Sequence, residues 1–328
     1  AATTTKDITT LKDSPWGEVG VSKSSSEMGV IELMEQADGK SVTFLIDGLL
    51  KLQKKKPLAL QKTDTTKDEF TATLLKQIRR TMPSDAIVIY ITPDTYAEAA
   101  ANMQKETLEA FNNSFGAFAP PMNSGSSPIV MIRSPEFKVS ELTVELLTHE
   151  LLHANTSNSL KVPQTTLAKQ AVANLEELLE LSRAYMEKEK GNTPEFNSWL
   201  EAIHNVDELI SYGLTKNEFQ DKVLSQIQIS AESAEANYKG FKKFNSGLQA
   251  FIRNLSTLLF NNKKRFDENL LTGLGSLIYN SAIIINQPTA EEMQFRIETV
   301  APNSNLDNSS TIHLMAAPAA KDFTTLEV

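Results

Sequence analysis

His149-Glu150-Leu151-Leu152-His153 is the stretch of sequence from which the rest of the chain can be interpreted. It lies within residues 141–154, which include no Gly or Pro and carry leucines at helical spacing, so a helix is predicted there. Residues four apart lie one turn above each other on the same face of a helix. The two imidazoles can therefore reach one metal ion from one side, with Glu150 beside them.

This His-Glu-x-x-His pattern is typical of zinc hydrolases, in which the His pair binds the metal and the Glu acts as general base. The five residues also occur by chance on solvated helix faces, so an interpretation without metal stays open at this point. Ser140 is the predicted N-cap of the helix. The chain has four His and no Cys, so a metal site here must use His, carboxylate and water.

A tetrahedral zinc that keeps one position for water needs a third protein ligand. The candidates after the motif are Asp207, Glu208, His204 and His313. We favour Glu208, because residues 205–214 form a compact helical segment whose apolar side chains should pack on the core. The alternative is that Glu208 only closes a capping box with Asn205.

Composition indicates a soluble globular protein, with 41% hydrophobic residues and a formal net charge of −9 among 328 residues. The acidic balance argues against non-specific binding to nucleic acid or anionic membranes, which requires a basic face. No apolar run is long enough to span a membrane. Because the chain begins at Ala1 without an apolar leader, we expect a processed product or a piece of a longer protein, with any signal peptide already removed or never present.

The pattern along the chain predicts an α+β fold that is mostly helical, with a small sheet. Strands are predicted over 86–91 and 128–133, with a further short strand over 28–34. Helices are predicted over 42–52, 67–82, 96–111, 141–154, 163–190, 196–203, 237–260 and 266–285. Residues 112–127 are predicted to be a loop, and a second side-chain cap is predicted at Thr215.

The predicted organisation has four parts. Residues 1–40 form a flexible N-terminal arm, 41–230 the domain that holds the metal motif, 231–286 a C-terminal helical region, and 287–328 a linker or tail.

Two segments carry a resemblance to a known family. The motif continued by Ala154-Asn155-Thr156, and the segment from Asp207 to Gln220, resemble a zinc-metallopeptidase domain of large multidomain bacteriophage and mobile-element proteins. That family has a His-Glu-x-x-His-Ala-x-Thr helix, a downstream Glu in a short helix, and then an Asn-x-Glu-Phe-Gln-like segment. The likeness covers roughly residues 86–227. One departure is Ile210-Ser211-Tyr212, where small residues would be expected, which leaves substrate access and the packing around the ligands open.

The resemblance implies a zincin-like core of the gluzincin class, in which Zn²⁺ is held by His149, His153 and the distant Glu208. Glu150 would then act as general base on a water activated by the zinc. Tyr212 lies one turn after Glu208, so its hydroxyl could stabilise the oxyanion, although packing in the core is the alternative.

Three further expectations concern the surroundings of the site. The strand over 128–133 matches the edge strand that pairs with extended substrate in zincin-like proteins, and 112–127 is either a lid or a plain connection. His204, one turn before Glu208, either supports the ligands or is a surface residue.

The function expected from the motif and the resemblance is a zinc-dependent peptidase of a phage virion or of a processed phage polyprotein. It would act on a peptide or protein substrate in the virion or the host cell, with other virion proteins as candidate partners. One alternative is a structural or ejection protein of the virion with a non-catalytic zinc site. Another is hydrolysis of cell-wall peptide.

Overall fold

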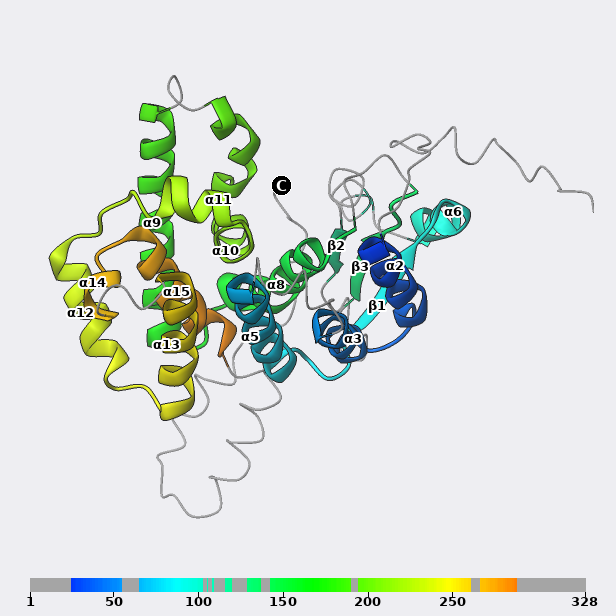
Figure 1. Ribbon diagram of the computed structural model, residues 1–328, viewed down its shortest axis with the longest axis horizontal. Helices are drawn as coiled ribbons and strands as arrows, with labels where there is room; N and C mark the ends of the chain where they lie inside the picture. Colours follow the sequence, from blue (N-terminus) through cyan, green and yellow to red (C-terminus); the bar gives the residue numbers. More distant parts are fainter. Residues whose placement is uncertain are drawn as a thin grey trace, which may run out of the picture.

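A large helical body and a small sheet make up the parts of the chain that the computed structural model describes (Figure 1). These parts are residues 25–54, 65–102, 105, 108, 116–119, 129–136, 142–189, 194–260 and 266–287. The predominance of helix with a small sheet confirms the predicted α+β class. No helix within these parts has the length and apolar character needed to cross a membrane.

The sheet has three strands in the order β1-β3-β2, which are β1 (Ile87–Ile91), β3 (Ile129–Arg133) and β2 (Gly116–Ala119). β3 is parallel to β1 and antiparallel to β2. The two strands predicted from short β-branched runs, over 86–91 and 128–133, are confirmed. β2 lies within the predicted 112–127 loop and corrects that prediction at its four residues, whose Gly-Ala-Phe-Ala sequence has little β-propensity of its own.

The prediction that residues 128–133 form an edge strand is wrong, because β3 has a strand on each side. The outer side of β1 is also covered: the Gly39 amide donates to the Val88 carbonyl and the Val88 amide to the Lys40 carbonyl, each at 2.8 Å. Among the described strands, β2 is therefore the other edge strand of the sheet.

The N-terminal helices are α2 (Ser25–Ala37), α3 (Val42–Lys54), α5 (Thr65–Thr81) and α6 (Pro93–Asn102). Helices α2, α3 and α6 pack against β1, and α5 packs against α3, α8 and α13. The strand predicted over 28–34 is wrong, since these residues belong to α2. Val30, Leu33, Met34 and Ala37 are buried on one face, and their spacing fits a period of 3.6 rather than 2.

The C-terminal half is helical throughout its described residues. Its elements are α8 (Val144–Lys161), α9 (Thr166–Glu189), η1 (Pro194–Trp199), η2 (Glu201–Ile203), α10 (Val206–Thr215), α11 (Asn217–Phe219), η3 (Gln220–Leu224), α12 (Ala231–Phe241), α13 (Ser246–Phe260), α14 (Phe266–Asn269) and α15 (Gly273–Ile285).

Side-chain caps explain where several predicted helices are wrong. The predicted helix over 237–260 is split because Asn245 accepts a hydrogen bond from the Leu248 amide at 2.9 Å. The predicted helix over 266–285 is split where Thr272 accepts from the Gly275 amide at 3.1 Å. Thr215 is not the predicted cap: it is the last residue of α10, and its hydroxyl donates to the Ser211 carbonyl at 2.6 Å.

The helix α15 is buried on every side, and all thirteen of its residues lie in the interior. A helix surrounded by other helices has no solvent-facing stripe. It packs against α9, α13, α8 and α10. The buried Asn280 side chain is satisfied internally: its amide donates to the Ser276 carbonyl at 2.8 Å, and its Oδ1 accepts from the Asn174 amide at 3.0 Å. One cluster of buried apolar residues thus extends from α2 to α15 and includes the leucines of α8.

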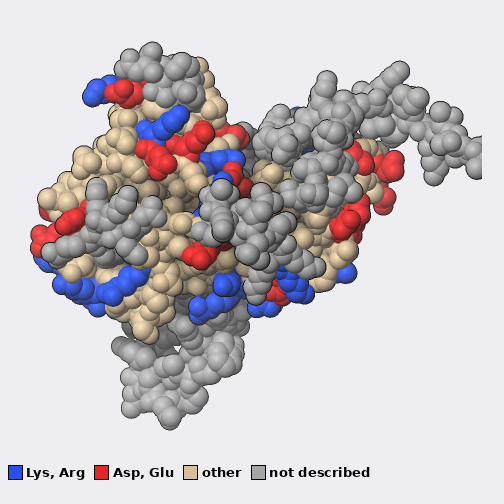
Figure 2. All heavy atoms as spheres, viewed as in Figure 1, with Lys and Arg blue, Asp and Glu red and all other residues tan. Residues whose placement is uncertain are grey.

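The surface seen in Figure 2 carries acidic and basic side chains together, with Lys and Arg gathered mainly along its lower margin. No single sign of charge covers the described part of this face, in keeping with a chain of moderate net negative charge.

The helix α8 begins at Val144 and is capped by Thr143, whose hydroxyl oxygen accepts a hydrogen bond from the Leu146 amide at 3.1 Å. The predicted cap, Ser140, is therefore wrong, and that residue lies outside the described parts of the chain. The helix starts one turn closer to the His pair than the sequence suggested.

Replacing this cap tests the start of α8. We expect Thr143→Ala to lower the free energy of unfolding by about 1 kcal/mol, because the Leu146 amide loses its acceptor. Ser140→Ala is the matched control and should leave stability unchanged in a urea titration. Destabilisation by Ser140→Ala with no effect of Thr143→Ala would place the cap at the residue predicted from sequence.

Candidate metal centre

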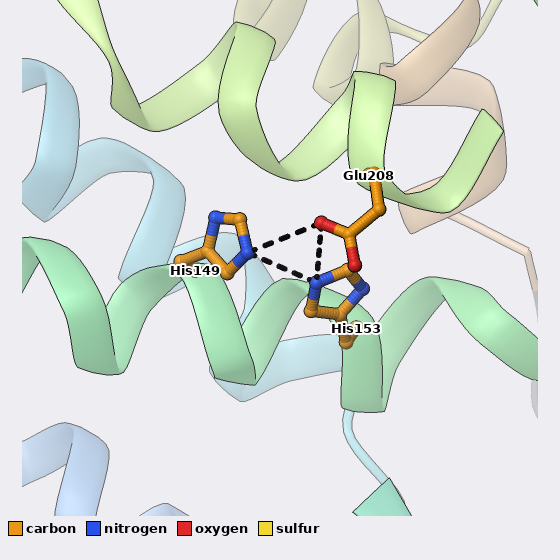
Figure 3. A group of neighbouring side chains, drawn as sticks. All are labelled: His149, His153 and Glu208. Carbon is orange, nitrogen blue, oxygen red and sulfur yellow. Dashed lines mark hydrogen bonds and ion pairs between the residues drawn. The ribbon is translucent and has the colours of Figure 1, made fainter. Parts of the chain in front are cut away.

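Two packed helices bring the candidate ligands together (Figure 3). His149 and His153 lie on one face of α8, and Glu208 lies in the first turn of α10 and points toward them. Asn205 caps α10, with its side-chain oxygen accepting from the Glu208 amide at 2.9 Å. The Asn205 half of the predicted capping box is thus present, while the Glu208 carboxylate is directed at the two imidazoles.

The three ligand atoms form a nearly equilateral triangle. His149 Nε2 and His153 Nε2 lie 3.0 Å apart, and Glu208 Oε2 lies 3.5 and 3.4 Å from them. A tetrahedral ion with bonds of about 2.0–2.1 Å separates its ligand atoms by about 3.3 Å. The group can therefore hold one metal ion with little movement of the side chains.

The state of Glu208 Oε2 supports the same conclusion. This oxygen is buried and has no hydrogen-bond donor among the described residues. Burial alone would raise the pKa of Glu208, but the two neighbouring imidazoles lower that pKa to about 2, so the carboxylate is charged at neutral pH. A buried anionic oxygen beside two imidazole nitrogens is a suitable environment for a divalent cation, and the N, N, O donor set is common for zinc.

Asp207 holds His153 from the other side of its ring. His153 Nδ1 lies 3.1 Å from Asp207 Oδ2, and the hydroxyls of Thr156 and Ser157 donate to the same carboxylate at 2.8 and 2.5 Å. Although burial lowers the pKa of His153, Asp207 raises it well above 6.5 in the absence of metal. With the proton held on Nδ1, the Nε2 lone pair is directed toward the metal position.

His149 is held by packing rather than by a second polar partner. Its ring contacts the edge of the Tyr212 ring, with centroids 4.9 Å apart at an interplanar angle of 87°. Its Nδ1 is buried, and no group in the described parts of the chain forms a hydrogen bond with it. The two ligand imidazoles are therefore oriented by different means.

Glu150 is buried beside the triad. Burial raises the pKa of its carboxyl, the charges of His153 and His149 oppose that rise, and Glu208 and Glu201 add to it. Arg133, at the end of β3, is also within electrostatic range of Glu150; burial lowers the pKa of Arg133 to about 10, and Glu150 partly offsets this. The residue predicted to be the base thus lies within electrostatic range of Arg133 on the strand and of the two imidazoles on its own helix.

The other candidates are placed differently. His204 is exposed, and it contributes its backbone carbonyl to a hydrogen bond from Arg183 at 2.6 Å. His313 lies outside the described residues. The Tyr212 hydroxyl donates to Glu201 Oε2 at 2.8 Å rather than pointing freely toward the metal position.

From the sequence, Asp207 was only an alternative to Glu208 as the third ligand, and Glu201 was not predicted to belong to the site. The position of Asp207 next to Glu208, in the first turn of a capped helix, is a signal that it shares the site. No signal of that kind exists for Glu201, which precedes Tyr212 by 11 residues across a break between helices.

None of the family models, curated proteins or solved structures with which the chain was compared matches it.

Removing the charge of Asp207 tests its role. We expect Asp207→Asn to weaken zinc affinity about 10- to 100-fold, because the neutral amide no longer fixes the His153 ring and raises its basicity less. Competition with a chromophoric chelator would measure the affinity. Ser157→Ala, which removes one donor to Asp207 and keeps the charge, should have a much smaller effect; equal affinities of Asp207→Asn and wild type would contradict this role.

The same ion pairs give the metal-free protein a characteristic pH dependence. The raised pKa of His153 means that its contribution to stability is complete below the unfolded value of 6.5 and is lost as the pH rises through the folded pKa. The lowered pKa of Glu208 means that its contribution is complete above 4.5 and is lost as the pH falls through about 2. Together these two groups predict that the stability of the metal-free protein is highest between pH 4.5 and pH 6.5.

Zinc should reverse this trend above the maximum, because protons compete with the metal for His153 and the competition weakens as the pH rises. The measurement is the difference in Tm between wild type and His153→Ala from about pH 5 to 8, with chelator and with zinc. The difference should shrink with pH in chelator and grow with pH in zinc. Parallel curves in the two conditions would show that the site does not bind metal through His153.

Proposed function

We propose that the protein is a zinc-dependent peptidase in which His149, His153 and Glu208 hold the metal and Glu150 is the general base. The observation that carries the proposal is the closed triangle of three ligand atoms from α8 and α10, with a buried carboxylate next in sequence to one of the ligands. When bound, zinc would supply an activated water and polarise the carbonyl of the scissile bond.

Glu150 has the properties that such a base requires. Burial raises the pKa of its carboxyl, and a raised pKa makes a carboxylate a stronger base toward the attacking water. Glu150 would accept the proton of the attacking water and later deliver it to the leaving amine. The charges of the neighbouring His153 and His149 oppose the rise in the pKa of Glu150 that burial causes.

A zincin-like arrangement and a peptide substrate are also proposed. Extended peptides bind exposed sheet edges through backbone hydrogen bonds. Because β3 is central, β2 would offer this edge, and β2 packs against α8. A substrate paired with β2 would therefore run beside the helix that carries the His pair. Its recognition would depend on backbone groups more than on side chains.

The resemblance of residues 149–156 and 207–220 to the phage domain supports an origin in a phage virion protein or processed polyprotein. A second candidate function follows from the Tyr212–Glu201 hydrogen bond, which occupies the hydroxyl expected to stabilise the oxyanion. In that case the zinc would only join α8 to α10 in a structural or ejection protein of the virion.

Glu150→Gln separates these two functions. We expect it to reduce cleavage of an unfolded protein substrate by at least about 10³-fold, because the amide cannot accept the proton of the attacking water. Zinc content should stay at the wild-type level, since Glu150 is not a ligand. Hydrolysis by the variant equal to wild type would contradict the peptidase proposal, and absence of hydrolysis in both would favour the structural alternative.

A further inference from the structure

A side chain outside the metal-binding triad is connected to it through Tyr212. The Tyr212 hydroxyl donates to Glu201 Oε2 at 2.8 Å, while the Tyr212 ring packs on His149 with centroids 4.9 Å apart. Glu201 begins η2, and η2 packs against α10. The packing of η2 against α10 therefore places the Glu201 carboxylate beside Tyr212, the residue whose ring packs on the ligand His149.

The charge of Glu201 is not balanced by a cation within the described parts of the chain. Its hydrogen-bond partner is a neutral hydroxyl. Other carboxylates near the centre differ: Asp207 and Glu208 face imidazoles, and Glu145 forms ion pairs with Lys67 and Lys216 at 2.7 and 2.5 Å. Glu201 is also solvent-exposed, so an incoming molecule can reach it.

Glu201 lies near the group that would perform the chemistry. Glu201 is hydrogen-bonded to Tyr212, whose ring packs on His149, the neighbour of Glu150 in sequence. The negative charge of Glu201 is therefore close enough to act on the buried general base. A positive charge placed beside Glu201 would also relieve the repulsion between these two carboxylates.

The segment that carries Glu201 is anchored. Arg183 of α9 donates from Nε to the Ile203 carbonyl at 2.9 Å and from Nη2 to the His204 carbonyl at 2.6 Å. These bonds hold the C-terminal end of η2 immediately before the Asn205 cap of α10. The separation between Glu201 and the first turn of α10 is thus set by the fold before any ligand binds.

We propose that Glu201 binds a positively charged amine of the substrate, next to the scissile bond, and so selects for cationic peptides. This inference rests on the proposed peptidase function and names the substrate class of the same site. The amine is either the free amino terminus or a Lys side chain, since both present an ammonium group. An ammonium is a charged donor, so one that binds Glu201 Oε2 would compete with the neutral Tyr212 hydroxyl for that oxygen.

Displacement has a consequence for Tyr212. The Tyr212 phenol is a protonated donor at neutral pH, and in the free protein its hydroxyl donates to Glu201. Once released from Glu201, the hydroxyl could donate to the oxyanion that develops on the substrate carbonyl. In the free protein the Tyr212 hydroxyl is bonded to Glu201. Binding of a cationic substrate would release this hydroxyl for the oxyanion.

Binding of peptides to zinc-loaded Glu150→Gln protein tests the inference without requiring turnover. Three synthetic pools share the same random interior of neutral residues: one has a free amino terminus, one is acetylated, and one is acetylated but carries a single Lys. We expect the free-amine pool, the Lys pool or both to be retained at least about tenfold over the neutral acetylated pool. Whichever cationic pool is retained identifies the source of the amine.

Adding Glu201→Gln should abolish this preference while retention of the neutral pool stays the same. Glu232→Gln, which removes the same charge from an exposed position on α12, is the matched control and should keep the preference. Zinc content, measured in each variant, should not change. Equal retention of all three pools by the Glu150→Gln protein, or a preference that survives Glu201→Gln, would overturn the inference.

The outcome separates this inference from the proposed function. If the cationic preference depends on Glu201 but wild-type protein cleaves none of the pools, the amine site stands and the peptidase proposal fails. If wild-type protein cleaves the neutral acetylated pool as fast as the cationic pools, the peptidase proposal stands and the role of Glu201 is refuted.

Discussion

The packing of α8 against α10 is the constraint on which the site depends. Thr156 and Asp207, which touch across this contact, are 51 residues apart in sequence. Consecutive residues of α10 then hold one imidazole through both of its nitrogens: Glu208 lies 3.4 Å from Nε2 of His153, and Asp207 lies 3.1 Å from Nδ1. A shift of one helix along the other by a single turn would break both contacts together, since one turn of helix rises about 5.4 Å.

Two features outside the site keep these helices in register. The buried helix α15 contacts both α8 and α10. It approaches α10 closely at Gly213, where a Cβ would lie 2.3 Å from the Leu277 side chain. At the other end of α10, Lys216 forms an ion pair with Glu145 in the first turn of α8. The packing of α15 and the Lys216–Glu145 ion pair therefore hold α8 and α10 in place, and with them the two imidazoles and the carboxylates of the site.

The parts of the site that local sequence controls were predictable. The His pair on one helix face follows from the four-residue spacing, and Asn205 was recognised as a cap because its acceptor lies three residues before Glu208. The choice of Glu208 over Asp207 came from the compact helical segment 205–214 and was strengthened by the family resemblance, although both carboxylates stand in the same turn. The structure shows the two acting on the same histidine, one at each nitrogen.

The errors arose where tertiary contacts decide. Residues 28–34 are apolar enough for a strand, yet their buried face has helical spacing. The burial of α15 on every side depends on partners from distant segments, which its own sequence does not specify. β2 has weak β-propensity and exists through pairing with β3. The Tyr212–Glu201 contact depends on the path of η1 and η2, which no local pattern specifies.

The most direct test of the account is the metal content of the purified protein, measured by native mass spectrometry after incubation with zinc and removal of the excess. Wild type should hold one zinc per chain, and Glu208→Ala should lose it, because two imidazoles alone bind zinc too weakly to survive the removal step. His204→Ala, which alters an exposed histidine outside the triangle, should keep one zinc. Absence of zinc from wild type, or full occupancy in Glu208→Ala, would contradict the three-ligand centre.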